Sequence, residues 1–236
     1  MRMFCRSLVV VALASSAMVA GATRASGQQG RSRPDPASSS FWLAGGALVA
    51  AAAASDAQFE RFSLEHRSPM LDDLGSAGNV LGTGRYLIPA LGASYVLGRF
   101  THHPHLAQGT LHTAVAYALG NVVTSAGKPL LGRHRPDTTG SAWRFRPLAT
   151  GGEWHSLPSA HTVHAFTLAA AISEEARRPW VTTVAYGAAT LVAWSRVYRD
   201  EHWASDVAIS SVLGAAIGHA TVRVLHARAA ATHRTP

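Results

Sequence analysis

Cysteine and lysine are scarce in this sequence of 236 residues, and each shortage bears on the chemistry available to it. The one cysteine, Cys5, lies near the N-terminus, so the rest of the chain has neither a disulfide nor a cysteine nucleophile. Lys128 is the one lysine, and every other fixed cation is an arginine. A lone lysine is of interest where it falls inside a motif, because arginine is the usual cation of this chain.

The sequence also lacks the signals of β-structure and of nucleic-acid binding. It has no hairpin signal and no run of alternating apolar and polar residues. The formal charge of +8 and the pI of about 10.7 attract anionic partners such as phosphorylated substrates or acidic lipid headgroups. Nucleic acid is not an expected partner, because the arginines are scattered between apolar segments and form no basic stripe with interleaved aromatic residues.

Apolar stretches rich in alanine and leucine alternate with Pro, Gly, Asp and Arg, which is typical of helices and their ends. They cover residues 41–54, 86–97, 106–126, 163–172, 180–194 and 207–222. With 47% hydrophobic residues, a chain of this length can bury one sizeable core. The sequence therefore predicts an all-α fold, a six-helix bundle in one domain.

The N-terminal region is typical of an exported protein. Two arginines precede an apolar stretch of small residues that ends at Ala20-Gly21-Ala22, so residues 1–22 are predicted to be a signal peptide, or a signal anchor if they are not cleaved. Residues 23–40 are rich in Gly, Ser, Arg and Pro and are predicted to be a flexible linker. The main domain is expected over residues 41–226, followed by a disordered tail at 227–236.

Two locations within the cell envelope suit these helices. Most of the apolar stretches are shorter than the roughly 20 residues needed to span a bilayer, and the mean hydropathy is only +0.09. Their many small residues, on the other hand, suit close helix packing in lipid. We expect a membrane-associated protein whose site faces the periplasm, with a soluble periplasmic bundle as the alternative.

A phosphate-binding helix start is indicated at residues 156–161. Pro158 interrupts the chain, Ser159 is a favourable N-cap, and the first amides of the following helix lack intrahelical partners. His161 would then stand beside a bound phosphate, where an imidazolium can give a proton to a departing alcohol oxygen. The alternative is an ordinary capped helix that exposes a histidine.

A second histidine, His202, has a carboxylate four residues further on, at Asp206. On a helix the two side chains share one face, so the carboxylate can hold one ring nitrogen and leave the other free as a nucleophile. The alternative is a contact on the surface of a helix. Lys128, Arg135 and Arg196 could supply positive charge for the oxygens of a phosphate, or could be solvated charges at helix ends.

Together these clusters resemble the type 2 phosphatidic acid phosphatase superfamily, which includes bacterial acid phosphatases and vanadium haloperoxidases. Its signature of Lys, six residues, Arg-Pro matches residues 128–136, and its Ser-Arg, five residues, His, three residues, Asp matches residues 195–206. Its Pro-Ser-Gly-His element appears as Pro-Ser-Ala-His at 158–161. Ala160 keeps the amide of the family glycine but adds a methyl group close to the phosphate. The resemblance extends over residues 41–222.

The resemblance implies a metal-independent phosphatase without a cofactor, in which His202 is the nucleophile, Asp206 its orienting partner and His161 the general acid. It implies that the phosphate is bound by Lys128, Arg135, Ser159, Ala160 and Arg196. The expected substrates are phosphate monoesters or diphosphates, in particular lipid phosphates. The alternatives are a vanadate-dependent haloperoxidase and a non-catalytic membrane protein that binds lipid phosphates. The sequence leaves the identity of the ester and the oligomeric state open.

Several other residues are not expected to take part in this chemistry. His102, His103, His105 and His112 suggest a metal site, but Pro104 disrupts their helical spacing, and no acidic partner is close in the sequence. A polar loop between helices is expected there. His164 is expected to be a core histidine. Four arginines are expected to add local positive potential without contacting the phosphate: Arg133, Arg144, Arg146 and Arg199.

Overall fold

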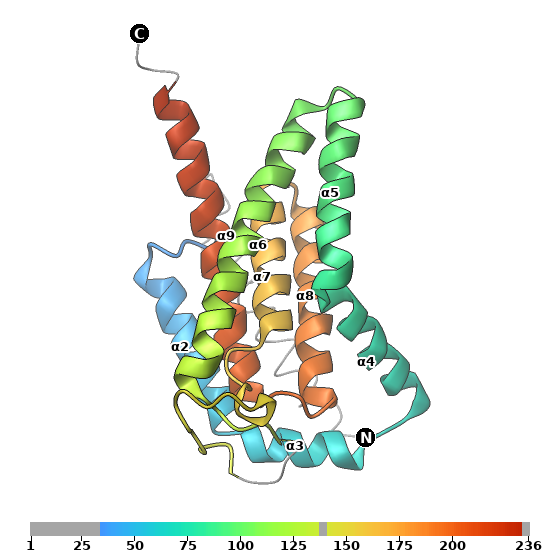
Figure 1. The fold of residues 1–236 in the computed structure, drawn as a ribbon, viewed down its shortest axis with the longest axis vertical. Helices are drawn as coiled ribbons and strands as arrows, with labels where there is room; N and C mark the ends of the chain where they lie inside the picture. The colour runs from blue at the N-terminus through green and yellow to red at the C-terminus, as the bar shows by residue number, and fades with distance from the viewer. Residues whose placement is uncertain (1–33, 137–140, 233–236) are drawn as a thin grey trace, which may run out of the picture.

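The computed structural model describes residues 34–136 and 141–232, and in this part of the chain the regular structure is helical (Figure 1). The α-helices are α2 (Ser39–Ala53), α3 (Asp56–Glu65), α4 (Pro69–Gly82), α5 (Gly84–Phe100), α6 (Pro104–Leu131), α7 (Ala160–Ala176), α8 (Pro179–Tyr198) and α9 (Ala204–Thr232). A short 3-10 helix, η2 (Gly152–Trp154), lies between α6 and α7. The all-α fold expected from the sequence is confirmed.

The predicted count of six helices is wrong by two within the described residues, because α3 and α4 lie between the first two predicted segments. Helix α3 is polar along most of its length, and α4 carries three buried glycines, so neither shows a long apolar run. The local signal for α4 is its start, where the Ser68 hydroxyl accepts a hydrogen bond from the Leu71 amide and Pro69 is the first helical residue.

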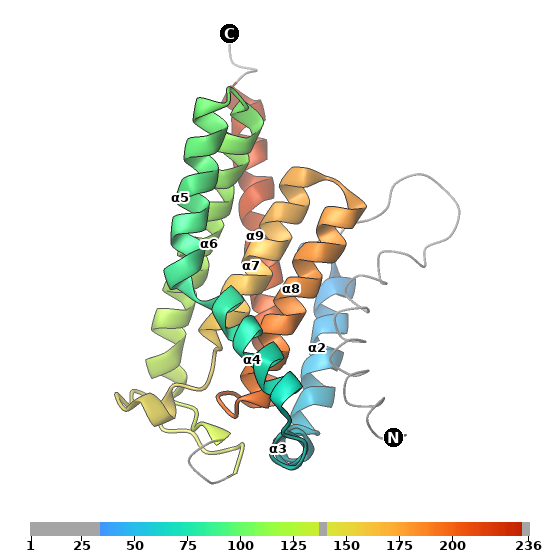
Figure 2. The same cartoon turned by 90° about the vertical axis from the view of Figure 1, so that its right-hand side faces the viewer.

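Helix α7 lies in the middle of the bundle, between α6, α8 and α9 (Figures 1 and 2). Its buried residues are mostly small, with Phe166 as the largest apolar side chain among them. Gly214 and Gly218 of α9 allow the two helix backbones to approach closely. A Cβ atom at Gly214 would lie 2.5 Å from the Val163 carbonyl oxygen, and one at Gly218 would lie 2.4 Å from that of Thr167. Small residues at this contact therefore fix the spacing of α7 and α9.

The ends of the main domain differ in part from the sequence prediction. Helix α9 continues to Thr232, so residues 227–232 of the predicted disordered tail are helical. The segment before α2 is tied to α9, because the Arg223 guanidinium donates to an Asp35 carboxylate oxygen at 2.6 Å and to the Pro34 carbonyl oxygen at 2.9 Å. The predicted signal peptide at 1–22 and residues 23–33 of the predicted linker lie outside the described residues.

Among the described residues, α9 is the one single helix that is long and apolar enough to cross a membrane, and 61% of its apolar window is buried within the fold. The bent pair of α2 and α3, with an angle of 58° between them, would count as a second such segment. Helices α5 and α6 carry large apolar side chains that are each more than 40% exposed: Tyr86, Ile88, Val96, Leu97, Phe100, Leu106, Leu111, Val115, Leu119, Val122, Leu130 and Leu131. An apolar surface therefore runs along this helix pair.

Candidate active site

The three polar clusters, which are far apart in the sequence, meet at one end of the bundle, drawn at the bottom of Figures 1 and 2. Helix α6 ends there at Leu131, the connection to α7 folds beneath it, and the turn between α8 and α9 lies beside the start of α7. Hydrogen bonds join the clusters directly: Arg135 donates to the Glu201 carbonyl oxygen at 3.0 Å, and the Ser156 hydroxyl donates to Asp206.

The connection after α6 is held by a sharp reversal at Gly132, which has a positive φ of 57°. A side chain there would collide with the backbone, since a Cβ atom would lie 1.8 Å from the Arg146 carbonyl oxygen. Beyond the reversal, the Arg135 amide donates to the Glu153 carbonyl oxygen at 2.8 Å, and the Ser156 amide donates to that of Arg133 at 3.0 Å. These bonds bring the first cluster against the segment that leads into α7.

The start of α7 is buried, with Ser159 at the N-cap position. The Ser159 side chain makes no capping hydrogen bond and instead accepts one from the Thr162 hydroxyl at 3.1 Å. Its amide donates to the Ser210 hydroxyl of α9 at 2.8 Å. Ala160 is the first helical residue, so its amide is among those that lack an acceptor within the helix. The expected helix start is thus present, although the hydroxyl of its N-cap does not cap it.

His161 lies in the first turn of α7, close to α4. Its Nε2 atom is 3.4 Å from the Thr83 hydroxyl, and Gly82 leaves room for the ring, because a Cβ atom there would lie 2.9 Å from the imidazole Cδ2. Burial lowers the pKa of His161 to about 3, and the positive charge of Arg196 acts in the same direction. In the absence of a bound anion, His161 is therefore neutral at pH 7.

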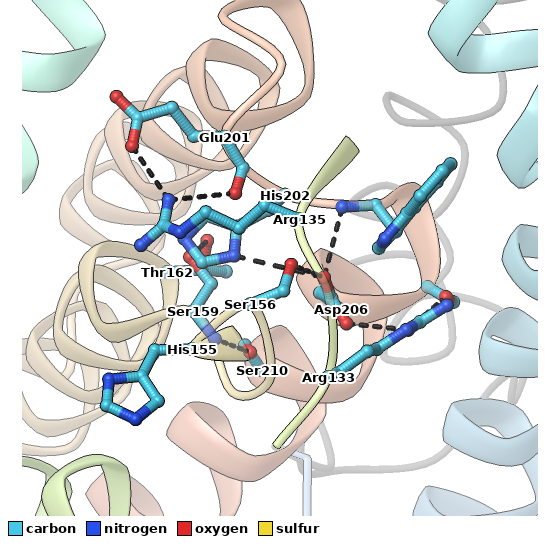
Figure 3. Close-up of polar contacts among 12 residues, drawn as sticks. Arg133, Arg135, His155, Ser156, Ser159, Thr162, Glu201, His202, Asp206 and Ser210 are labelled. Atoms are coloured by element: carbon cyan, nitrogen blue, oxygen red, sulfur yellow. Dashed lines mark hydrogen bonds and ion pairs between the residues drawn. The ribbon is translucent and has the colours of Figure 1, made fainter. Parts of the chain in front are cut away.

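His202 is buried in the turn before α9, and its Nδ1 atom lies 3.9 Å from an Asp206 carboxylate oxygen (Figure 3). The separation is longer than a hydrogen bond, and Nδ1 has no hydrogen-bond partner among the described residues. The two residues do not share a helix, because α9 begins at Ala204 and His202 precedes it. The turn nevertheless directs Nδ1 towards the carboxylate, which leaves Nε2 on the opposite side of the ring.

Asp206 is fully buried and is held by three donors (Figure 3). Its Oδ2 accepts from the Ser156 hydroxyl and from the Trp203 amide at 3.0 Å, and its Oδ1 accepts from Arg133 at 2.6 Å. The bond to Trp203 joins the third residue of α9 to the residue before the helix, as in a capping box. Burial raises the pKa of Asp206, but His202 and Arg133 outweigh that effect and hold it below its ordinary value. The side chain is thus a fixed carboxylate.

Arg133, expected from the sequence to add only local positive potential, is a buried partner of two carboxylates. Only 2% of its side chain is exposed, and its guanidinium pairs with Asp206 at 2.6 Å and with Asp56 of α3 at 3.0 Å. It also donates to the Ser205 hydroxyl at 2.8 Å. Arg133 therefore anchors the carboxylate behind His202, and α3 belongs to the support of the site.

The predicted phosphate-binding cations Lys128, Arg135 and Arg196 lie near His161 and His202. Lys128, in the last turn of α6, donates from Nζ to the His155 carbonyl oxygen at 3.4 Å. Burial lowers the pKa of Lys128 to about 8, and the neighbouring charge of Arg135 acts in the same direction. Arg196, at the end of α8, is almost fully buried and donates to the Asn79 side-chain carbonyl. An arginine fork at this place suits the oxygens of a phosphate.

Glu201 connects two of these cations, and the sequence did not suggest a role for it. One carboxylate oxygen lies 2.8 Å from Arg196, and the other lies 3.0 Å from Arg135 (Figure 3 shows the latter contact). Burial raises the pKa of Glu201, but the two guanidiniums outweigh that effect and lower it. An ionised carboxylate with 38% of its side chain exposed thus lies between the two arginines that would bind an anion.

The arrangement provides the parts that phosphoryl transfer requires. His202 offers a ring nitrogen on the side away from a fixed carboxylate, and His161 is close enough to His202 for the two rings to interact electrostatically. Lys128, Arg135 and Arg196 surround them with positive charge. Phosphoryl transfer needs mainly positioning and charge on the phosphate oxygens, which these groups can supply.

His164 lies one turn after His161 and belongs to the core, as expected from the sequence. It is buried against the Tyr117 ring, with 4.5 Å between the ring centroids. Burial lowers the pKa of His164 to about 4, with the charge of Lys128 acting in the same direction, so this ring is neutral at pH 7. A neutral, buried imidazole adds no charge to the site.

Comparison with known proteins finds a matching family and a related phosphatase. The sequence model of the PAP2 superfamily matches residues 109–230, just over half of the chain. A lipid A 1-phosphatase of Porphyromonas gingivalis is 34% identical over 107 residues, which are 44% of this chain and 21% of that protein. The chain thus matches about a fifth of the length of this curated relative.

Two crystal structures have a similar fold. LpxE of Aquifex aeolicus is 22% identical with a TM-score of 0.58, and the match covers 71% of this chain and 94% of that one. A membrane phosphatidylglycerolphosphate phosphatase of PAP2 type from Bacillus subtilis is also 22% identical, with a TM-score of 0.62 over 80% of this chain and 95% of the other. At this identity the two structures support the fold.

Proposed function

The chain belongs to the PAP2 superfamily, and we propose from this premise that it hydrolyses phosphate esters through a phosphohistidine on His202. One observation carries the proposal: the Nδ1 side of His202 faces the buried carboxylate of Asp206, so Nε2 is the nitrogen left for attack. Burial lowers the pKa of His202, although Asp206 raises it in part, and the ring is therefore neutral and has a free lone pair.

In the first step, His202 Nε2 forms a bond to phosphorus while the bond from phosphorus to the ester oxygen breaks. Positive charge develops on the imidazole, and the Asp206 carboxylate stabilises it. Protonated His161 gives its proton to the departing oxygen, so the alcohol leaves neutral. A substrate phosphate favours the protonated form of His161, because its negative charge raises the pKa of the ring from the low value of the free site.

In the second step, water attacks phosphorus and the bond to His202 Nε2 breaks, which restores the neutral ring and releases inorganic phosphate. His161 is now neutral and accepts the proton of the attacking water, so each turnover returns both histidines to their starting state. Lys128, Arg135 and Arg196 neutralise the phosphate oxygens throughout, together with the amides at the start of α7.

We propose lipid phosphates or lipid diphosphates as the substrate class. The relatives named above include a lipid A 1-phosphatase and a phosphatidylglycerolphosphate phosphatase. The exposed apolar side chains along α5 and α6 suit contact with lipid, and we propose that the protein is exported and associates with the membrane with its site towards the periplasm. In this arrangement the apolar side chains of α5 and α6 would contact the acyl chains of a lipid, while the candidate active site binds its phosphate.

A panel of esters tests the proposed function. Phosphate release is measured from phosphatidic acid, phosphatidylglycerol phosphate, a polyprenyl diphosphate and p-nitrophenyl phosphate, with membrane and soluble fractions assayed separately. Higher kcat/KM on a lipid ester, in the membrane fraction, is the expected result. Release from p-nitrophenyl phosphate alone would contradict the lipid substrate class. Binding of all lipids without release of phosphate would contradict the enzyme assignment and favour a lipid-phosphate-binding protein.

Turnover is expected to continue in the presence of EDTA and to stop with vanadate. The proposed chemistry uses the cations of the chain for charge neutralisation, so removal of divalent ions should leave kcat within about twofold. Vanadate adopts the five-coordinate geometry of the phosphoryl transition state and should inhibit competitively. Loss of activity in EDTA that a divalent ion restores would contradict the mechanism. Halide oxidation in the presence of vanadate would instead favour a haloperoxidase.

The lowered pKa of Lys128 predicts an alkaline limit to substrate capture. A pKa of about 8 means that the ammonium is present below that pH and is lost above it. The fraction of charged Lys128 then falls about tenfold per pH unit, and kcat/KM, which reports the free enzyme, should fall with it. Lys128→Arg is the matched control, because its guanidinium keeps its charge, so kcat/KM should not show this fall above about pH 8. The same decrease of kcat/KM at alkaline pH in both proteins would contradict the prediction.

Removing the charge of Glu201 is expected to tighten phosphate binding. Its carboxylate occupies the two guanidiniums that would bind the substrate, so Glu201→Gln should lower KM and the Ki of inorganic phosphate by about threefold to tenfold, a gain of ~1 kcal/mol. Glu153→Gln is the control, since Glu153 is an exposed carboxylate of the same region. A higher KM in Glu201→Gln would show that Glu201 positions the arginines and does not compete with phosphate.

A further inference from the structure

A second cluster of polar side chains lies on α6, α7 and α9, far from the candidate active site. His112 Nδ1 is 2.7 Å from Glu175 Oε1, and His226 Nε2 is 3.0 Å from the same oxygen. Glu175 and His161 lie near opposite ends of α7, and their separation of 14 positions corresponds to about 21 Å of helix. The cluster is therefore a separate feature of the fold.

The three side chains form a typical ligand set for a zinc-like ion. The ligand atoms, two imidazole nitrogens and one carboxylate oxygen, all lie within 4.8 Å of one another. Bonds of about 2.0–2.2 Å to a tetrahedral ion place neighbouring ligand atoms about 3.3–3.5 Å apart. The present separations of 2.7 and 3.0 Å from Glu175 are shorter by about 0.3–0.8 Å, so the side chains would have to rotate apart by less than one ångström to admit an ion.

Partial exposure makes the cluster reachable. The exposed fractions of the side chains are 12% for His112, 22% for Glu175 and 35% for His226. An ion can therefore enter from solvent without opening the core, and water can fill its fourth position. Gly109 of α6 leaves space beside the carboxylate, since a Cβ atom there would lie 3.3 Å from Glu175 Oε2.

The neighbouring residue Glu174 does not belong to this cluster, because its carboxylate binds other side chains. Glu174 accepts from His219 at 2.8 Å and from Arg223 Nε at 2.9 Å. Glu175, by contrast, points to two histidines and to no arginine or lysine among the contacts of the described residues. A carboxylate that lies between two imidazoles, without a fixed cation in contact among the described residues, is suited to a bound cation.

We propose that His112, Glu175 and His226 bind one zinc-like divalent ion that ties α6, α7 and α9 together at the end of α7 opposite the candidate active site. The sequence argued against a metal ligand at His112 because no acidic residue lies near it in the chain, and the fold supplies Glu175 from 63 residues away. The ion stabilises the folded state, since its ligands come from three helices.

Zinc titration of the full chain tests the site. The purified protein is stripped with EDTA, dialysed, and titrated with Zn²⁺ by calorimetry, and its Tm is followed in parallel. One ion per chain and a higher Tm with Zn²⁺ are expected. Co²⁺ in place of Zn²⁺ should give the visible absorption of a four-coordinate site. No saturable binding, or binding without any rise in Tm, would overturn the proposal.

Three variants locate the ion. Glu175→Gln keeps a hydrogen-bonding side chain between the histidines but loses the charged ligand, and His226→Ala removes a nitrogen, so each should weaken Zn²⁺ binding by at least about tenfold. His103→Ala is the control, because His103 is an exposed histidine before α6. Equal affinity in the wild type and Glu175→Gln, or loss of binding in His103→Ala, would overturn the site. Circular dichroism without added metal verifies that each variant is folded.

Discussion

Replacing His202 with alanine is expected to reduce phosphate release by a factor on the order of 10⁴ or more, with the fold retained. The imidazole is the group that forms the bond to phosphorus, and His202 is the one histidine of the described residues that lies beside the Asp206 carboxylate. The helices should survive, because the His202 side chain makes no hydrogen bond through Nδ1 that the core depends on. The measurement is kcat on the best substrate, with circular dichroism and Tm recorded beside it.

His155→Ala provides a matched control for the loss of a histidine near the site. The His155 ring is bonded to the Ala149 carbonyl oxygen at 3.0 Å, and it is the backbone oxygen of His155 that meets Lys128. Removal of the ring should leave kcat within about an order of magnitude. A folded His202→Ala protein with turnover similar to that of His155→Ala would contradict the nucleophile assignment.

Trapping the intermediate separates the two proposed roles of histidine. Acid-labile, base-stable labelling with radioactive phosphate should appear in the wild type and be absent from His202→Ala. His161→Ala should still be labelled by p-nitrophenyl phosphate, whose leaving group needs no proton, and should lose the label slowly because water lacks its base. Absence of label in His161→Ala and full label in His202→Ala would reverse the assignments.

The residues of the candidate site were predictable from the sequence because their spacing is local. His202 and Asp206 are four residues apart, and Ser159 and His161 belong to one helix start, so a short stretch of chain fixes each pair. Even here the local structure differed: His202 lies in a turn before α9 and not on the helix. The carboxylate reaches the ring because Asp206 also binds the Trp203 amide, which fixes the turn.

Contacts between distant segments were not predictable in the same way. Arg133 is separated from Asp206 by 73 residues and from Asp56 by 77, and nothing in its sequence neighbourhood distinguishes it from the exposed arginines that follow. His112 and Glu175 are a further example. Helices α3 and α4 escaped prediction because their burial depends on tertiary contacts, whereas the other six have long apolar runs.

Replacing Arg133 with methionine is expected to lower the free energy of unfolding by about 3–5 kcal/mol, the largest effect on stability that the site predicts. The substitution preserves most of the side-chain volume but leaves the carboxylates of Asp206 and Asp56 buried without their shared cation. Chemical denaturation with a cooperative unfolding transition gives the measurement. Arg146→Met is the control, because Arg146 is exposed, and should change stability by less than about 0.5 kcal/mol.

The pH dependence of this loss distinguishes unpaired charge from poor packing. In the wild type the pKa of Asp206 lies below its ordinary value, so its contribution to stability is present above the unfolded pKa of about 3.9 and is lost as the pH falls. Without Arg133 the pKa of each buried carboxylate rises, and the variant gains stability relative to the wild type as acid protonates them. The difference between the two proteins should therefore shrink from pH 7 towards about pH 5.

Asp56→Asn in the Arg133→Met background should recover part of the loss at pH 7, since one buried charge is removed. A difference independent of pH and unaffected by Asp56→Asn would mean that Arg133 acts through its volume and not through the charges that hold Asp206 in place.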